Sequence, residues 1–307
     1  MKILWLLIFL LIPVRCLAGY DKPGSTSAQF LKIGISARAV GMGESFVAIS
    51  NDASAIFYNP AGLVTIGDWD ALLTHIEYPA DINYDFGGLA HRLTPNIALG
   101  VSFSNLYTDE IKVRTPLHPE GTGETFYSSD YTAALSYAQY LTDRFSFGLN
   151  FRYIGLNPMT GSFKKSTWAI DLGTLYQTGF KNFNIGIAIQ SFGPNVQFIN
   201  ESYAIPTNFT VGIAADLLTT GPHNLTLASS WAKPAATEET ANIGVEYTLN
   251  KIFTLRGGYK INYDAETWSL GAGVTLPLGG SILRVDYAYS DFGYLTNTQR
   301  FSLGIGF

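Results

Sequence analysis

The last seven residues of the chain read Phe301-Ser302-Leu303-Gly304-Ile305-Gly306-Phe307. Large apolar side chains alternate here with small or polar ones. Because successive side chains of a β-strand point to opposite faces, this segment would have one apolar face and one small or polar face. A strand between lipid and the lumen of a barrel has this pattern, and so does a half-buried strand of a soluble protein.

The same alternation recurs along most of the chain and favours the barrel. Between residues 268 and 276, for example, Trp, Leu, Ala, Val and Leu alternate with Ser, Gly, Gly and Thr. Segments of about ten residues with this period, separated by turns, are typical of transmembrane β-barrels. Fourteen strands are predicted, with 69–78 the least regular: residues 69–78, 83–92, 97–107, 128–141, 145–155, 166–178, 183–193, 208–218, 225–233, 240–250, 253–263, 267–277, 281–291 and 300–307.

The connections between these strands alternate between short and long. The tight ones are residues 93–96, 142–144, 179–182, 250–251 and 278–280, and the longer, more polar ones are 108–126, 156–165, 194–207 and 292–299. Outer-membrane barrels have short periplasmic turns and longer external loops. An even strand number also places both termini on the periplasmic side. We therefore expect an all-β membrane protein, an antiparallel transmembrane β-barrel of about fourteen strands over residues 69–307.

The composition agrees with a membrane barrel and excludes other classes. Of 307 residues, 47% are hydrophobic, 14% aromatic and only 14% charged, whereas soluble domains average about 25% charged residues. Low charge combined with many aromatic residues excludes a disordered chain. The net charge of −5 gives no reason to expect nucleic-acid binding.

The N-terminus predicts export. A positive start, Met1-Lys2, is followed by the apolar run 3–14, and small residues before Gly19 allow cleavage after Ala18. We therefore expect a signal peptide at residues 1–18, because the apolar run is too short to span a membrane as a helix. The only cysteine, Cys16, lies in this segment, so the mature chain would have no thiol chemistry.

Residues 19–68 form a separate, non-alternating segment. Residues 53–58 predict a short helix that ends at Asn59, because Pro60 disfavours the helical conformation in the residue before it. The segment is dense in alanine and glycine, which suits a compact hatch, or plug, packed inside the lumen. A periplasmic extension is the alternative.

Three stretches of this segment resemble a known family. They are Phe30-Leu31-Lys32-Ile33-Gly34, the stretch from Ala37 to Gly43, and the stretch from Asp52 to Leu63. Together they resemble the N-terminus of the PorV/PorQ family, part of the wider FadL-like group of outer-membrane proteins. The element Asn59-Pro60-Ala61 is shared with the fatty-acid transporters, where it lies in the N-terminal hatch. The resemblance implies either uptake of hydrophobic compounds or a role in type IX protein secretion. The candidate hatch motif is Gly41, Gly43, Asn59, Pro60 and Ala61.

Charged residues on the lumen side of the predicted strands are the other candidates. By alternation, the inward-facing set contains Asp85, His91, Arg152, Asp171, Asp216, Glu246, Arg256, Lys260, Arg284 and Asp286. One interpretation is that these residues pair with one another and with the hatch, as buried charges must. The other is that some line a ligand path, in which Arg256, Lys260 and Arg284 would hold a carboxylate or phosphate head group.

No pattern predicts covalent chemistry. The chain has no nucleophile elbow, no complete dinucleotide fingerprint and no P-loop, and its four histidines lack metal-ligand spacing. We expect no enzyme, cofactor or metal, although a barrel hydrolase whose serine and histidine meet only in space is an alternative.

The predicted function is binding or passage of a hydrophobic or amphipathic small molecule by a monomeric barrel in the bacterial outer membrane. The alternative is a component of type IX secretion that binds client proteins at this membrane. The expected partners are membrane lipid, such a ligand or client, and the barrel-assembly machinery, which would recognise the C-terminal Phe307. A soluble secreted β-protein is a third class, and it would lack a lipid-facing band.

Overall fold

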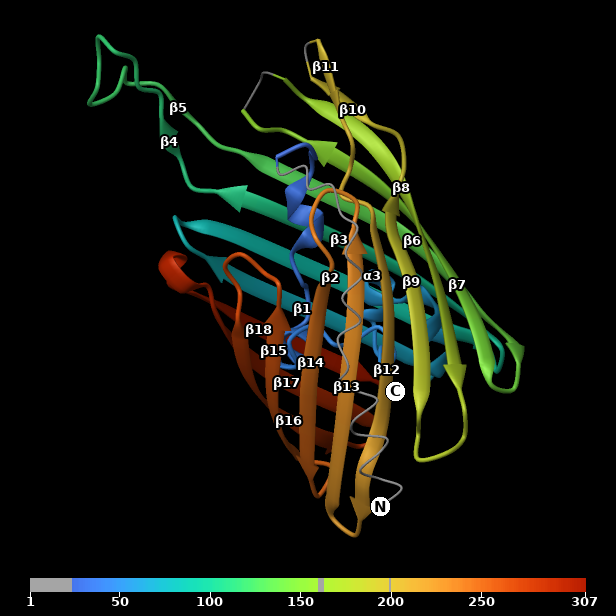
Figure 1. The fold of residues 1–307 in the computed structure, drawn as a ribbon. Coiled ribbons are helices and arrows are strands. Elements are labelled where there is room, and N and C mark those ends of the chain that lie inside the picture. Colours follow the sequence, from blue (N-terminus) through green and yellow to red (C-terminus); the bar gives the residue numbers. More distant parts are fainter. Residues whose placement is uncertain (1–23, 160–162, 199) are drawn as a thin grey trace.

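Fourteen strands close into an antiparallel barrel in the computed structural model, which describes residues 24–159, 163–198 and 200–307 (Figure 1). The strands are β1 (Trp69–Tyr78), β2 (Ile82–Thr94), β3 (Ile97–Thr108), β6 (Ser129–Thr142), β7 (Phe145–Leu156), β8 (Lys165–Gln177), β9 (Asn184–Phe192), β12 (Asn208–Thr220), β13 (His223–Pro234), β14 (Thr240–Leu249), β15 (Phe253–Ile261), β16 (Trp268–Leu278), β17 (Ser281–Asp291) and β18 (Asn297–Gly306). The barrel prediction is confirmed, and each predicted strand boundary is within three residues of the observed one. The predicted signal peptide lies outside the described residues.

The barrel closes between its first and last strands. β1 pairs with β18 from Asp70 opposite Gly306 to Glu77 opposite Gln299. Phe307 continues the contact, because its backbone N–H donates to the carbonyl of Trp69 at 2.9 Å. A closed barrel has no unpaired edge, so every strand has two partners.

Two small hairpins lie within the long connections, and they were not predicted from the sequence. β4 (Ile111–Lys112) pairs with β5 (Thr125–Phe126), and β10 (Val196–Phe198) pairs with β11 (Glu201–Tyr203). Figure 1 shows the β4–β5 hairpin projecting well beyond the barrel wall. A short 3₁₀ helix, η3 (Gly293–Leu295), precedes β18. We call this end of the barrel the long-loop end and the opposite end the short-turn end.

The two faces of the wall differ as the alternation predicts. In β16, Leu270 is 55% exposed on the outer face, whereas its neighbours Ser269 and Gly271 are buried on the inner face. Large apolar side chains of other strands, such as Phe103, Leu135 and Leu255, are likewise exposed on the outside. No helix in the described residues has the length and apolarity to cross a membrane.

The inward assignment of Asp85 and His91 is wrong. In β2 the even-numbered residues are the buried ones, so Asp85 and His91 face outward. The phase was misjudged because the inner face of β2 is itself apolar, and the ring of Tyr84 packs edge-on to Phe30 at 6.3 Å. On the outside, Asp85 pairs with His75 at 2.6 Å, and the ring of His91 stacks on Trp69.

Residues 24–68, which we call the lumen segment, pack against inner faces all around the barrel. Their elements are η1 (Gln29–Lys32), α2 (Ala37–Gly41), α3 (Ala55–Tyr58) and η2 (Pro60–Thr65). α2 contacts β15 to β18, whereas η2 contacts β2, β3, β6, β7 and β8 on another part of the wall. The predicted short helix is α3, and it ends at Asn59, whose φ of −159° and ψ of 100° are extended. Neither α2 nor the two 3₁₀ turns was predicted from the sequence.

The lumen segment runs from one end of the barrel to the other. Thr26 forms a parallel bridge with Ala204 in a long connection, and the N–H of Ser27 donates to the Ala204 carbonyl at 2.9 Å. At the other end, the N–H of Asp68 donates to the carbonyl of Phe307 at 2.8 Å. The barrel itself starts and ends at the short-turn end, as predicted. The first described residues, however, lie at the long-loop end, which the sequence reasoning did not foresee.

Candidate functional site

Glycines on the inner wall receive the backbone of the lumen segment. A Cβ on Gly258 of β15 would lie 1.9 Å from the backbone nitrogen of Gly43, and one on Gly244 of β14 would lie 2.3 Å from the carbonyl oxygen of Met42. Gly43 itself has φ +61°, a conformation that glycine adopts without strain. A Cβ on Gly41 would lie 3.0 Å from the Cα of Gly271. At these positions the absence of a side chain therefore lets the backbone of the lumen segment contact the backbone of the barrel wall.

The Asn59-Pro60-Ala61 element packs against a second set of wall glycines. The amide nitrogen of Asn59 donates to the carbonyl oxygens of Val47 and Thr174, at 2.7 and 3.0 Å, and its amide oxygen accepts from the N–H of Ala61 at 3.2 Å. Asn59 is fully buried. A Cβ on Gly173 would lie 2.1 Å from its amide oxygen, and one on Gly148 would lie 2.2 Å from Ala61 N. The hatch motif thus joins two parts of the segment to β8.

A chain of buried charges connects α2 to the wall. Arg38 donates twice to the carboxylate of Glu246 in β14, at 2.9 Å in each case. Glu246 also accepts from Arg256 at 2.7 Å, and Arg256 donates to Asp286 at 2.6 Å. Asp52 lies 3.6 Å from Arg38. These carboxylates hold the pKa of Arg38 above its usual range despite burial.

Four further wall charges form two ion pairs. Arg284 donates to Asp70 at 2.7 Å, and the other oxygen of Asp70 accepts from the N–H of Ala53 in the lumen segment at 2.8 Å. Arg152 donates to Asp171 at 2.5 Å in a buried pair. Asp70 therefore anchors the lumen segment to β1, whereas the Arg152–Asp171 pair joins β7 to β8.

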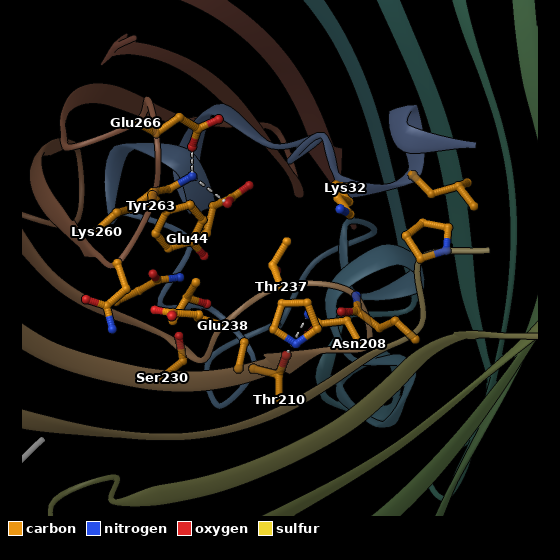
Figure 2. Close-up of a pocket in the computed structure, with 18 of the residues that line it drawn as sticks. Lys32, Glu44, Asn208, Thr210, Ser230, Thr237, Glu238, Lys260, Tyr263 and Glu266 are labelled. Atoms are coloured by element: carbon orange, nitrogen blue, oxygen red, sulfur yellow. Dashed lines mark hydrogen bonds and ion pairs between the residues drawn. The ribbon is translucent and has the colours of Figure 1, made fainter. Parts of the chain in front are cut away.

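Lys260 joins the lumen segment to a loop. Its amine donates to Glu44 at 2.8 Å and also contacts Glu266 in the connection before β16, as the dashed lines of Figure 2 show. Glu44 has φ +63°, a strained value for a residue with a side chain.

The structure therefore places the seven principal lumen candidates, Arg152, Asp171, Glu246, Arg256, Lys260, Arg284 and Asp286, inside the barrel. It pairs each of them with an opposite charge. Asp216 is also on the inside, where it accepts from Thr226 at 2.7 Å. A shared head-group site of Arg256, Lys260 and Arg284 is not assembled, because each already faces a different carboxylate.

Sequence reasoning missed four anchors of the lumen segment. Arg38 and Glu44 lie in a segment without period, so nothing indicated their partners. Asp70 lies in β1, which the sequence read as irregular. Arg300 is 1% exposed and donates to the carbonyl of Gly34 at 3.1 Å. The inward direction of Arg300 could have been predicted, because this residue alternates in phase with the inward-facing residues of β18.

A cavity of about 440 Å³ opens at the long-loop end (Figure 2). The lumen segment supplies apolar residues to its lining, including Leu31, Val47 and Phe57, whereas β12 to β14 supply amides and hydroxyls. Lys32 points into this space from the segment (Figure 2), and partial burial lowers the pKa of its amine. Burial raises the pKa of the Tyr263 hydroxyl, which also lines the cavity.

A second cavity of about 630 Å³ opens at the short-turn end. It is lined by turn residues such as Arg144 and Asn182 and by Ala48 to Asn51 of the lumen segment. Val47 lines the first cavity and Ala48 the second, so the segment is the partition between them. Within the described residues, no cluster of His, Cys, Asp and Glu could hold a metal ion.

Comparison with known families agrees with this architecture. The model of the family described as type IX secretion system protein PorV matches residues 21–237. The chain belongs to the PorV family. No curated protein sequence matches this PorV-family chain.

Solved structures show the same fold. The toluene transporter TbuX of Ralstonia pickettii is 15% identical, with 89% of this chain and 97% of that one covered and a TM-score of 0.63. The toluene transporter TodX of Pseudomonas putida is 12% identical, with 89% and 97% covered and a TM-score of 0.60. A FadL homologue of Pseudomonas aeruginosa is 13% identical, with 94% and 99% covered and a TM-score of 0.55.

The PorV-family chain is thus an outer-membrane β-barrel with a FadL-like fold, as the sequence predicted. The family and these structures are described as a secretion component, transporters and a FadL homologue, and not as enzymes.

Proposed function

We propose that this PorV-family protein binds an amphipathic small molecule in the long-loop cavity and passes it through the barrel, without covalent chemistry. The observation that carries the proposal is the pair of cavities at opposite ends, separated by the lumen segment. The long-loop cavity is within the ordinary size range of ligand pockets, and it combines an apolar side with a few polar groups. The lumen segment acts as the hatch of this monomeric barrel. The description of the family as a secretion component and the transporters of similar fold both support a role in passage across the membrane.

Blocking the long-loop cavity should slow passage of a hydrophobic probe. Ala232 lines this cavity, so Ala232→Trp would fill part of it. Cells that produce the native barrel should take up N-phenyl-1-naphthylamine, measured by its fluorescence on entry, several-fold faster than cells that produce Ala232→Trp.

The matched control is Leu255→Trp, which adds the same ring on the lipid-facing side of β15, where Leu255 is 63% exposed. It should leave uptake at the native rate. Equal uptake by the Ala232→Trp variant, the native barrel and cells without the barrel would contradict the proposal.

The long-loop end should face the outside of the cell. A mature chain without cysteine allows single-cysteine labelling with a membrane-impermeant maleimide on intact cells. Gly24→Cys at the start of the described segment and Leu117→Cys in the β4–β5 hairpin should both be labelled, because both positions are exposed at this end. Thr220→Cys at the short-turn end should be labelled only after lysis. Labelling of Thr220→Cys alone on intact cells would reverse this orientation.

The second candidate is a type IX secretion component that binds client proteins, and the PorV family match favours it. The projecting β4–β5 hairpin, with Leu117 87% exposed at its tip, is the surface that we assign to such a client. Removal of this hairpin tip should abolish client binding and spare probe uptake. Recognition of Phe307 by the barrel-assembly machinery stays a prediction.

A further inference from the structure

We propose that the buried amine of Lys260 prevents the long-loop cavity and the hatch from opening at the same time. Lys260 is the shared counter-ion of two carboxylates, Glu266 on the loop at residues 262–267 and Glu44 on the lumen segment. We call this loop the lid, because residues 262–266 line the long-loop cavity. The inference rests on the proposed function and describes how its two gates, the lid and the lumen segment, are regulated.

One buried ammonium group serves both gates. Lys260 belongs to the wall, on β15, and its side chain is only 6% exposed. Its amine donates to Glu44 at 2.8 Å and also to Glu266, and Figure 2 shows both carboxylates on this amine. Among the described residues, Lys260 is the only base within ion-pair distance of either carboxylate. The group therefore consists of one positive and two negative charges.

The middle of the lid has little other support. The two ends of the lid are tied to neighbouring elements by side-chain hydrogen bonds of Asn262 and Thr267, at 3.1 and 2.8 Å. Within the described structure, residues 263–266 form no backbone–backbone hydrogen bond. A segment with few such bonds opens at a low cost in free energy. The contact of Glu266 with Lys260 therefore helps to fix the lid in its closed position.

The lumen segment is held at the same amine. Glu44 has φ +63°, a conformation that a residue with a side chain keeps only where its surroundings fix it. Its carboxylate packs against Gly34, where a Cβ would overlap it. Arg300 donates to the carbonyl of Gly34 and to the hydroxyl of Tyr78, and it forms no ion pair with Glu44 in the described part of the chain. Lys260 is therefore the cation that fixes Glu44.

Sharing one cation makes the two contacts antagonistic. While both gates are closed, the two carboxylates repel each other at the amine. When the lid moves away with Glu266, this repulsion ends and Glu44 has the amine to itself, so the lumen segment is held more tightly. The reverse applies when the segment moves. Opening of both gates would leave a buried ammonium group without a partner, which is strongly unfavourable. The barrel therefore opens one gate at a time.

The first test measures opening of the lumen segment by the labelling of Ser45→Cys with a soluble maleimide, on the full barrel in lipid nanodiscs. Ser45 adjoins Glu44 and is 2% exposed, and its hydroxyl has no hydrogen-bond partner in the described residues that the change would remove. Glu266→Gln should slow labelling about tenfold, because Glu44 then has no competitor for the amine. Lys260→Met should speed labelling about tenfold, because Glu44 loses its partner.

The second test measures simultaneous opening of both gates by ion conductance in planar bilayers. The native barrel and Glu266→Gln should both conduct little, because one gate stays closed. Lys260→Met should conduct several-fold more, because opening both gates no longer leaves a buried ammonium group unpaired. Heat-modifiable migration on a gel shows that each variant is a closed barrel.

The matched control is the ion pair of Lys233 and Glu239, which joins β13 to the connection before β14. Lys233→Met and Glu239→Gln should leave labelling and conductance at their native values. Faster labelling in Glu266→Gln, as in Lys260→Met, would show that the two contacts only reinforce each other and would overturn the proposal. An unchanged labelling rate in Glu266→Gln would also overturn it.

Failure of the proposed function is measured separately, by uptake of N-phenyl-1-naphthylamine. A barrel that takes up no probe but shows opposite changes of labelling in Glu266→Gln and Lys260→Met would contradict passage and support the shared counter-ion.

Discussion

Deleting residues 24–64 should leave a closed barrel whose ion conductance in planar bilayers is at least about tenfold that of the intact chain, because barrels of this size without a plug leave an aqueous channel. The fourteen strands all lie C-terminal to the deletion, so the wall is complete without it. The two cavities would then merge, since Val47 and Ala48 form part of their partition.

The control for this deletion replaces residues 113–124, at the tip of the β4–β5 hairpin, with a short Gly–Ser link. This change removes chain of an exposed loop and no contact with the lumen, so conductance should stay at the intact value. Migration of unboiled and boiled samples on a gel identifies closed barrels in every case. A deleted barrel that folds and conducts no more than the intact chain would show that the segment is no hatch, and client binding would then become the leading function.

The alternation of side chains was sufficient to predict the barrel because each strand contacts a different medium on each face. Leu270 and Gly271 could be assigned to lipid and lumen from their neighbours alone. The same rule failed at Asp85, because the inner face of β2 packs against Phe30 and is as apolar as the outer face. The polarity of the side chains then no longer distinguishes the lumen face of β2 from its lipid face. Only the position of the lumen segment against β2 shows which residues face inward.

The contacts between the lumen segment and the wall could not be predicted from the sequence, for a different reason. The period of β14 and β15 predicts that Glu246 and Arg256 face the lumen, but Arg38 carries no such signal, because α2 is one turn of helix in an irregular segment. Likewise, the glycines of the wall read as generic small residues. The need for a glycine at 258 becomes evident only in the structure, where the backbone of Gly43 lies against it.

Glu246→Leu should lower the free energy of unfolding by about 3–5 kcal/mol, the usual cost of removing one partner from a buried ion pair. Glu246 is the shared acceptor of Arg38 and Arg256, whose side chains are 19% and 5% exposed. The variant leaves Arg38 with the more distant carboxylate of Asp52, at 3.6 Å, and the amide oxygen of Asn51, at 2.6 Å. Arg256 keeps Asp286. Denaturant titration of the barrel in lipid vesicles measures the change.

A matched carboxylate sets the scale for this loss. Glu239 pairs with Lys233 at 3.0 Å, but both side chains are 40% exposed, so Glu239→Leu should lower the free energy of unfolding far less than Glu246→Leu does. The double variant Arg38→Met/Glu246→Leu removes the stranded cation as well and leaves the Arg256–Asp286 pair. It should therefore be more stable than the sum of its two single changes predicts, by a coupling of about 1–3 kcal/mol. Strict additivity of the two changes would contradict the buried contact between α2 and β14. Equal losses in Glu246→Leu and Glu239→Leu would show that the lumen segment is held to the wall by its backbone and glycine contacts alone.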